Sequence, residues 1–212
     1  MIKVRNLNKV ISGIKILDDM NLTFENGKIY GLQGKNGSGK TMLLRAICGL
    51  IKITEGEIII DGKRLGKDIM FPDDVGILIE NPSFINKYTG FKNLKLIAEI
   101  QNKVGDEEIN SVIRSVGLNP DDRRTYRKYS LGMRQRLGIA CAVMGNPGIV
   151  LLDEPFNALD EAGIEQIRNL IYSVRDSGSV VIIACHDREE LESLSDEIFL
   201  LNDGKIVKHY EP

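Results

Sequence analysis

The 212 residues predict an α/β fold in which a mostly parallel sheet is covered by helices on both faces. Two short apolar runs rich in β-branched residues, at 149–152 and 179–185, flank a helical stretch at 161–176. Strands that are apolar on both sides and alternate with helices are typical of a buried parallel sheet. Apolar and polar residues alternate weakly over the first thirty residues, which predicts an N-terminal antiparallel β region. Apolar residues at helical spacing from about 82 to 146 predict an inserted all-helical subdomain.

Along the chain, the antiparallel region offers three candidate strands separated by Gly and Asn turns, at 2–7, 20–25 and 28–33. Residues 55–65 predict a strand that runs into an Asp-Gly hairpin turn. In the insert, the spacing of apolar residues predicts one amphipathic helix around Leu94, Ile97, Ile100 and Gln101. A second helix opens on the acidic segment 105–108, which suits a helix N-terminus. Its apolar face consists of Ile109, Val112, Ile113 and Val116. We therefore expect one domain, 1–212, with the helical insert at about 82–146.

Composition and charge exclude several classes of function. The net charge is -2, so the chain has no electrostatic footprint for nucleic acid, and the basic segment 123–128 is interpreted as a solvated face. The apolar runs are far shorter than the roughly 18 residues that cross a bilayer. The N-terminus lacks a signal-peptide pattern, so we expect a cytoplasmic location. The cysteines are odd in number and lie among apolar neighbours, which predicts buried reduced thiols rather than disulfides or metal ligands for Cys48, Cys141 and Cys185.

The glycine-rich segment GKNGSGKT at 34–41 fits the phosphate-binding pattern G-x-x-x-x-G-K-[ST]. It follows an apolar strand and opens a helical stretch at 41–50, so we prefer this reading to a flexible glycine loop. Its backbone N–H groups and the helix N-terminus bind phosphates, Lys40 adds a positive charge, and Thr41 offers an oxygen to Mg²⁺. The predicted nucleotide ligands in this segment are Gly34, Lys35, Asn36, Gly37, Ser38, Gly39, Lys40, Thr41 and Met42.

Polar side chains follow both apolar runs of the predicted parallel sheet. Asp153 is expected to hold Mg²⁺ and its water shell, and Glu154 to position and polarise the attacking water. The alternative is a simple strand-to-turn transition before Pro155. His186 follows the second run, at the carboxyl end where open α/β sheets bind ligands, although a lone histidine is usually structural. The predicted catalytic residues are Glu154, His186 and Lys40.

The segment YSLGMRQRL at 129–137 predicts a second helix N-terminus that can attract an anion. Ser130 and Gly132 precede a periodic helix, so the turn presents a hydroxyl, free N–H groups and the positive end of the helix dipole. The apolar positions of that helix are Met133, Leu137, Ala140, Cys141 and Met144. Taken alone, this is a plain N-cap. Because it belongs to an insert that projects away from the glycine-rich loop, we expect it to serve a nucleotide bound by another molecule.

Together these motifs resemble the ATP-binding subunit of ABC transporters over essentially the whole chain. GKNGSGKT resembles the Walker A loop, SLGMRQR the signature motif, IVLLDEP Walker B, NALD at 157–160 the D-loop, and His186 the switch histidine. The resemblance implies a P-loop NTPase core that binds ATP and Mg²⁺. It implies a head-to-tail pair of ATP-binding subunits, most simply a homodimer, in which Ser130 and Gly132 of one chain close the site of the other. It also implies separate membrane-spanning permease subunits and a peripheral place at the cytoplasmic face of the cell membrane.

Two positions depart from the family pattern. The family stacks an aromatic ring on adenine about where this chain has residues 9–13. No aromatic residue occurs before Phe24, so we hypothesise that Ile11 makes only an apolar contact with the base.

The second departure is Glu80, in GILIENPSF, where the family has a Gln near the metal. Because a carboxylate beside phosphate is strongly repelled, we predict that Glu80 joins Thr41 and Asp153 as a metal ligand. Glu80 and SLGMRQRL resemble the branch linked to bacitracin and lantibiotic self-protection. That branch often extends further than GKIVKHYEP, so we expect no added regulatory contacts there.

The predicted function is an Mg²⁺-dependent ATPase that powers export of a peptide antibiotic or similar amphiphilic substrate. We expect it to dock on its permease through the helical insert near 81–100. A soluble ABC ATPase acting as an assembly or regulatory module is the alternative, although the long coiled coil of DNA-handling versions and the second cassette of translation-factor versions are lacking. A third class, a module that senses ATP without turnover, is disfavoured by Glu154 and His186. The sequence does not name the transported substrate.

Overall fold

The computed structural model describes residues 1–101 and 104–212. The smaller sheet is antiparallel with the order β2-β1-β4-β5 and consists of β1 (Ile2–Ile11), β2 (Ile14–Phe24), β4 (Glu55–Ile60) and β5 (Lys63–Arg64). The larger sheet has the order β10-β9-β3-β8-β7-β6 and consists of β3 (Lys28–Gln33), β6 (Val75–Leu78), β7 (Ile149–Asp153), β8 (Val180–Cys185), β9 (Glu197–Asn202) and β10 (Lys205–Tyr210). The helices are α1 (Lys40–Ile47), α2 (Gly90–Gln101), α3 (Asp106–Ser115), α4 (Leu131–Val143), α5 (Glu161–Asp176) and α6 (Arg188–Glu192), with a short 3₁₀ helix, η1 (Tyr126–Lys128).

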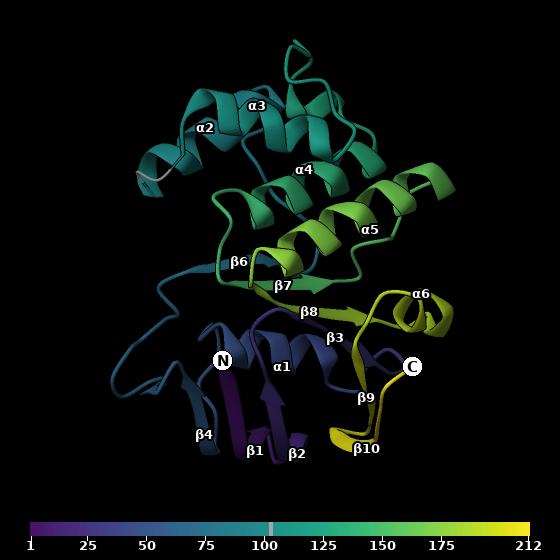
Figure 1. Cartoon of the computed structure of the whole chain (residues 1–212). Helices are drawn as coiled ribbons and strands as arrows, with labels where there is room; N and C mark the ends of the chain where they lie inside the picture. The colour runs from purple at the N-terminus through teal and green to yellow at the C-terminus, as the bar shows by residue number, and fades with distance from the viewer. Residues whose placement is uncertain (102–103) are drawn as a thin grey trace.

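These elements are stacked in layers. From top to bottom in Figure 1, α2 and α3 lie outermost, followed by α4 and α5, the larger sheet, α1 and the antiparallel sheet. The predicted class, a mostly parallel sheet with an N-terminal antiparallel region and helices on both faces, is confirmed. Helix α1 is enclosed between the two sheets, with Leu43, Leu44 and Ile47 fully buried. This enclosure holds its N-terminus rigidly beside the larger sheet.

The parallel strands of the larger sheet end at one edge. β3 pairs in parallel with β8 and β9, and β7 pairs in parallel with β6 and β8. The register sets Gln33 opposite Cys185 and Asp153 opposite Ala184, so the carboxyl ends of β3, β7 and β8 lie side by side. Open α/β sheets bind ligands at such an edge. The motifs predicted from separate stretches of sequence therefore converge there.

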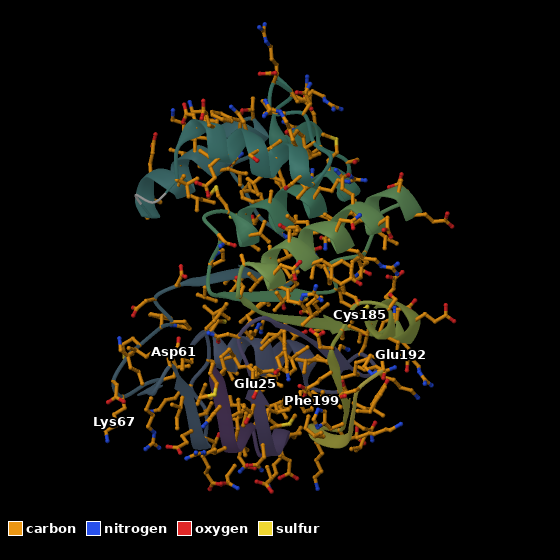
Figure 2. The ribbon with its side chains drawn as sticks, in the orientation of Figure 1. Glu25, Asp61, Lys67, Cys185, Glu192 and Phe199 are labelled. Atoms are coloured by element: carbon orange, nitrogen blue, oxygen red, sulfur yellow. The ribbon has the colours of Figure 1, made fainter. Side chains whose placement is uncertain are left out.

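Two hydrophobic cores lie on opposite faces of the larger sheet. Alternate residues of β7 and β8 belong to one core and then the other, because successive side chains of a strand point to opposite faces. Figure 2 shows Phe199, from the core shared with the antiparallel sheet, and Cys185, from the core under the helices, while Asp61 and Lys67 lie at the outer edge. Both β7 and β8 are buried along their whole length, which explains their uninterrupted apolar sequences.

The predicted hairpin at 55–65 is confirmed as β4 and β5. Its two turn residues, Asp61 at φ 48° and Gly62 at φ 82°, have the positive φ values of a type I′ turn. The same Asp-Gly pair recurs at Asp203 (φ 46°) and Gly204 (φ 75°), where it joins β9 to β10. That second hairpin was not predicted, although its turn carries the same signal.

The helix predictions were right in type and less accurate in detail. α5 spans the predicted 161–176, and α3 opens on the acidic segment as expected. The helix expected at 41–50 was too long, because α1 ends at Ile47 and Gly49 takes the left-handed conformation at φ 77°. The apolar face of α2 was partly wrong: Leu94 and Ala98 are buried, but Ile100 is 85% exposed. Among the described residues, no helix has the length and apolar character that crossing a membrane requires.

Candidate active site

The glycine-rich loop at 34–41 joins β3 to α1 and bends through two left-handed glycines, Gly37 at φ 84° and Gly39 at φ 105°. Gly39 is the N-cap of α1, no side chain caps this helix, and its first turn contains no acidic residue. By contrast, α3, α5 and α6 carry acidic residues in their first turns. The first-turn N–H groups of α1 therefore remain available to an anion, which the helix dipole also attracts.

Two buried polar side chains show what this loop is built to bind. The ammonium group of Lys40 donates to the carbonyl oxygens of Gly34 at 2.5 Å and Lys35 at 3.3 Å, and the residue is only 5% exposed. The hydroxyl of Ser38 is also buried and has no hydrogen-bond partner among the described residues. Leaving such a group unsatisfied costs about 1–3 kcal/mol. A phosphate oxygen would accept from both side chains, so the loop fits the phosphates of ATP.

A pocket of about 340 Å³ lies over this loop. Its lining joins the two motifs that were predicted separately, and consists of Ile16, Asn36, Gly37, Ser38, Gly39, Lys40, Thr41, Met42, Asp153 and Glu154. Ile16, on β2, was not singled out from the sequence, and it supplies an apolar wall. Ile11, which we expected against the base, is 42% exposed and is not among the lining residues. We call this space the nucleotide pocket.

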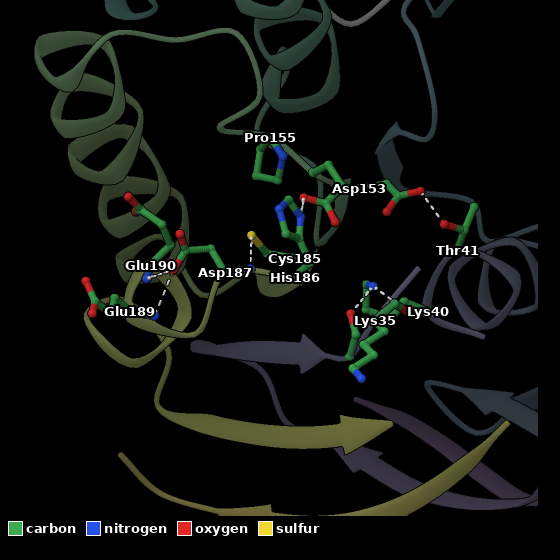
Figure 3. Close-up of polar contacts among 12 residues, drawn as sticks. Lys35, Lys40, Thr41, Asp153, Pro155, Cys185, His186, Asp187, Glu189 and Glu190 are labelled. Carbon is green, nitrogen blue, oxygen red and sulfur yellow. Dashed lines mark hydrogen bonds and ion pairs between the residues drawn. The ribbon is translucent and has the colours of Figure 1, made fainter. Parts of the chain in front are cut away.

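Thr41 and Asp153, which both line the nucleotide pocket, are joined by a direct hydrogen bond (Figure 3). The Thr41 hydroxyl donates to a carboxylate oxygen of Asp153 at 2.6 Å. Burial raises the pKa of Asp153, the hydrogen bond from Thr41 acts against this rise, and the negative charge of Glu154 adds to it. Both side chains offer the oxygen ligands that Mg²⁺ prefers. Mg²⁺ would be held by Thr41 and Asp153, where it would neutralise charge on the phosphates during hydrolysis.

Glu154 and His186 form a polar pair at the end of β7 and β8. Nδ1 of His186 lies 2.8 Å from a carboxylate oxygen of Glu154. Glu154 has a left-handed backbone at φ 48°, and its N–H donates to the carbonyl of Ala184 at 2.8 Å. The side chain of Glu154 is only 21% exposed, whereas that of His186 is 57% exposed. A carboxylate held in this way by an imidazole can accept a proton from a water molecule in the nucleotide pocket.

Gln135, on α4, also supports this site and was missed by the sequence reasoning. It is buried, and its side-chain amide donates to the carbonyl oxygens of Glu154 at 3.0 Å and Pro155 at 3.2 Å. The amide thus ties the helical insert to the backbone of the predicted general base. A glutamine inside the apolar helix that follows Ser130 was the available signal, because a buried polar side chain needs partners.

Glu80 is paired with Arg45 of α1 and is not among the residues that line the nucleotide pocket. Its backbone is left-handed at φ 61°, and its side chain is 63% exposed. The negative charge of Glu80 nevertheless contributes to the raised pKa of Asp153, so its carboxylate lies within electrostatic range of the nucleotide pocket. Its role as a metal ligand stays a prediction. The contact with Arg45 was not foreseen.

Ser130 and Gly132 lie outside the nucleotide pocket. Ser130 is the N-cap of α4, and its hydroxyl accepts from the N–H of Met133 at 3.2 Å. A Cβ atom at Gly132 would lie 2.7 Å from the carbonyl oxygen of Ala158, so only glycine allows the close contact with segment 157–160. We call residues 130–132 the signature turn. Its predicted contact with a nucleotide stays a prediction, because the signature turn is not among the residues that line the nucleotide pocket.

The groups assembled at this edge of the sheet suit hydrolysis of a phosphoanhydride, in which the loop would hold the phosphates and Glu154 is the predicted general base. The protein is therefore a P-loop ATPase by fold and by site. A family model described as ABC transporter matches residues 17–157, which is more than half of the chain. The chain belongs to the ABC transporter family.

Several relatives are similar over nearly the whole chain. The ABC transporter ATP-binding protein YybJ of Bacillus subtilis (strain 168) is 46% identical over 97% of this chain and 94% of its own. The bacitracin transport ATP-binding protein BcrA of Enterococcus faecalis is 35% identical, over 98% of this chain and 68% of its own. The lantibiotic transport ATP-binding protein SrtF of Streptococcus pyogenes is 34% identical, over 100% and 91%. A dimeric, post-hydrolysis structure of the ATP-binding cassette MJ0796 with ADP and Pi has a TM-score of 0.90 at 27% identity, covering 100% of this chain and 98% of that one.

These comparisons confirm the central predictions. The chain is an ATP-binding subunit of an ABC transporter, it binds ATP with Mg²⁺, and it hydrolyses ATP. The resemblance to the bacitracin and lantibiotic branch is confirmed as well, since relatives with both names match along the chain. The alternative of a soluble, non-transport ABC ATPase finds no support.

Proposed function

We propose that this chain drives export of a peptide antibiotic or similar amphiphilic molecule, as a peripheral subunit at the cytoplasmic face of the cell membrane. Two relatives are named for transport of such compounds, bacitracin and a lantibiotic. In the molecule itself, the observation that best supports this proposal is that the nucleotide site of a single chain is incomplete. The nucleotide pocket holds Lys40, Asp153 and Glu154, whereas the signature turn lies outside it. Energy from ATP is thus coupled to the meeting of two chains.

The second half of each site comes from another copy of this chain. Ser130 and Gly132 sit at the N-terminus of α4, whose first turn contains no acidic residue. In a head-to-tail homodimer this positive helix end faces the phosphates held by the partner's loop. Dimeric structures of the similar cassette MJ0796 support the pairing of two copies.

Hydrolysis then follows from the roles of the chain's own residues. The N–H groups of the loop and the Lys40 ammonium bind the phosphates, and Thr41 and Asp153 would hold Mg²⁺, which would balance the charge of the phosphates. Glu154 accepts a proton from the attacking water, and His186 orients that carboxylate through the 2.8 Å contact. Closure of the dimer completes the site, and release of phosphate lets the two copies part.

The permease docks on the exposed apolar side chains near Glu80. Leu50 is 53% exposed and Phe71 56% exposed, and a Cβ at Gly49 would contact the Phe71 ring, so these residues lie close together. The Arg45–Glu80 ion pair joins this end of α1 to segment 79–85, where Ile85 is 50% exposed. We therefore extend the docking surface expected near 81–100 to include Leu50 and Phe71. Its occupant is an apolar cytoplasmic segment of the permease, because contiguous exposed apolar surface marks binding sites for proteins.

The transport role is tested in a host that is sensitive to bacitracin and to a lantibiotic. The chain and its permease partner are expressed together, and the lowest inhibitory concentration of each antibiotic is measured. We expect resistance to at least one of them with the intact chain and none with the Glu154→Gln chain. A Phe71→Ser chain should lose resistance while its ATPase persists, and Val207→Ser, at an exposed apolar position on β10, is the matched control. Unchanged sensitivity with a correctly assembled complex would contradict the proposed substrate class.

A further inference from the structure

Cys185 has chemistry that ATP hydrolysis does not use. It is the last residue of β8, it is 3% exposed, and it immediately precedes His186. Its sulfur accepts a hydrogen bond from the N–H of Asp187 at 3.4 Å. Figure 3 shows this sulfur beside the His186 ring, on the side of the ring toward α6. The thiol is therefore buried in the core at the carboxyl end of β8, where this core meets the catalytic edge of the sheet.

Three different metal-binding atoms meet at this point. The sulfur of Cys185, a carboxylate oxygen of Glu154 and a ring nitrogen of His186 all lie within 4.8 Å of one another. The oxygen and the nitrogen are already 2.8 Å apart. Among residues 1–101 and 104–212, this is the group of three Cys, His or acidic side chains whose atoms come close enough to share an ion. In the described part of the chain, Cys48 and Cys141 belong to no such group.

The distances suit a tetrahedral ion. Zn²⁺ binds sulfur at about 2.3 Å and nitrogen or oxygen at about 2.0–2.2 Å, so its ligand atoms lie roughly 3.3–3.6 Å apart. Small rotations of the Glu154 carboxylate and the exposed His186 ring reach that spacing, while β8 holds Cys185 in place. Three protein ligands leave a fourth position open for water or a phosphate oxygen. The Thr41 and Asp153 pair offers only oxygen ligands and therefore selects Mg²⁺, so the two sites take different ions.

We propose that Glu154, Cys185 and His186 form a binding site for a thiophilic divalent cation such as Zn²⁺, and that occupancy of this site stops ATP hydrolysis. The ion takes the carboxylate that activates water and the imidazole that orients it. The thiol proton of Cys185, and any proton on the coordinating nitrogen of His186, are released to solvent, and nothing is oxidised or reduced. Binding rests on geometry alone, whereas the inhibitory effect rests on the proposed catalytic role of Glu154.

Oxidation of the Cys185 thiol is a less favourable reaction than metal binding. Burial raises the pKa of Cys185 to about 12, so the thiolate that reacts with oxidants is scarce at neutral pH. A bound cation replaces the thiol proton and removes this obstacle, because a coordinating thiol is deprotonated. The sequence alone favoured a buried inert thiol, since the neighbours of Cys185 along the chain are apolar. In the fold, its sulfur also lies close to the carboxylate of Glu154 and the ring of His186.

The test titrates Zn²⁺ into the full-length protein at constant excess Mg²⁺ and ATP, and refers each variant to its own rate without Zn²⁺. We expect half-inhibition of the wild type at low micromolar Zn²⁺, reversed by a zinc-selective chelator. Cys185→Ser should need at least about tenfold more Zn²⁺, because loss of a group that only orients the metal ligands already weakens metal affinity about 10–100-fold. The matched control is Cys141→Ser, which also removes one cysteine and should behave as the wild type.

Cd²⁺ is the direct probe of binding. Its thiolate charge-transfer absorption should appear in the wild type and in Cys141→Ser and be absent in Cys185→Ser.

Equal Zn²⁺ inhibition of wild type and Cys185→Ser, or Cd²⁺ absorption that persists in Cys185→Ser, would overturn the site. Absorption that depends on Cys185 but leaves ATP hydrolysis intact would support the metal site and contradict the inhibition, and with it the role given to Glu154. The binding readout needs no turnover, so failure of the site and failure of the proposed function are told apart.

Discussion

Helices α1 and α4 both begin at a turn suited to an anion, but their surroundings differ. The first turn of α1 is enclosed between two sheets, with Lys40 and the buried Ser38 hydroxyl beside it. The first turn of α4 is open, with Leu131 64% exposed, and the Ser130 hydroxyl already accepts from Met133. One turn has the charge and enclosure to hold phosphate by itself, and the other has only a helix end.

This difference explains why two chains are needed. A helix N-terminus alone contributes about 0.3–1 kcal/mol to binding of an exposed charge, which is too little to capture a nucleotide. Facing phosphates that α1 of another chain already holds, the same helix end acts in a site from which water is excluded, where its field is stronger. The α1 turn therefore serves binding and the α4 turn serves closure. The predictions below test that division of labour.

The largest effect is expected at the predicted general base. Glu154→Gln keeps the size of the side chain but cannot accept the proton, so ATP hydrolysis should fall by about 10²–10⁴-fold. ATP should still bind, because the loop and Lys40 are intact. With ATP and Mg²⁺ the variant should accumulate as a dimer, measured by gel filtration beside a phosphate-release assay.

The control for this variant is Lys40→Ala, which should lose ATP binding and remain monomeric under the same conditions. A Glu154→Gln chain that binds ATP yet stays monomeric would refute closure by a second copy.

The next effect separates a plain N-cap from a nucleotide-closing turn. Ser130→Asp preserves capping, because Asp is as good an N-cap as Ser, so thermal stability should stay the same or rise slightly. Its carboxylate would face phosphate in the dimer, where two negative charges about 4 Å apart cost on the order of 4 kcal/mol. We expect ATP hydrolysis to fall by about 100-fold or more, with ATP binding to the monomer unchanged.

Ser130→Asn is the matched control, since it caps the helix without a charge and should retain more activity than Ser130→Asp. Equal activity of the two variants would mean that Ser130 only caps α4.

The contrast between local and distant contacts also explains what could be predicted from the sequence. The P-loop at 34–41, the ends of β7 and β8, and the N-cap Ser130 are local patterns, in which a few adjacent residues determine the conformation. The turn at Asp203 and Gly204 was equally local, so the hairpin of β9 and β10 could have been found. By contrast, the error at Ile100 arose because apolar periodicity does not show where neighbouring helices stop covering α2.

Contacts between segments far apart in sequence could not be predicted. Gln135 reaches Glu154 across 19 positions, and Arg45 reaches Glu80 across 35, and in each case the partner depends on how two elements pack. Ile16 enters the nucleotide pocket because β2 runs beside the loop, and no spacing in the sequence indicates that. Local chemistry identified the site, whereas its supporting contacts depend on the three-dimensional fold.

A smaller effect is expected from a change in contact with the adenine base of ATP. Ile16 is the aliphatic residue in the lining, and no aromatic residue is among those that line it. Ile11→Tyr adds a ring at the end of β1, and stacking on adenine is worth about 1–3 kcal/mol per base. We expect about tenfold tighter ATP binding, equivalent to about 1.4 kcal/mol, measured by titration calorimetry with Lys40→Ala as the non-binding reference. Unchanged affinity would place residue 11 out of reach of the base and leave Ile16 as its apolar contact.

The smallest effect concerns the link between the two regions, where Glu80 is paired with Arg45. The two side chains are 63% and 30% exposed, so loss of the pair should lower the free energy of unfolding by at most about 0.2–1 kcal/mol. Glu80→Gln and Arg45→Gln both break the pair, but only the first removes a carboxylate that could reach the metal. If Glu80 acts on the metal, only Glu80→Gln will shift the Mg²⁺ concentration needed for half-maximal ATP hydrolysis. If the two variants shift it equally, or neither does, Glu80 serves the ion pair alone, and the link between α1 and segment 79–85 is structural rather than catalytic.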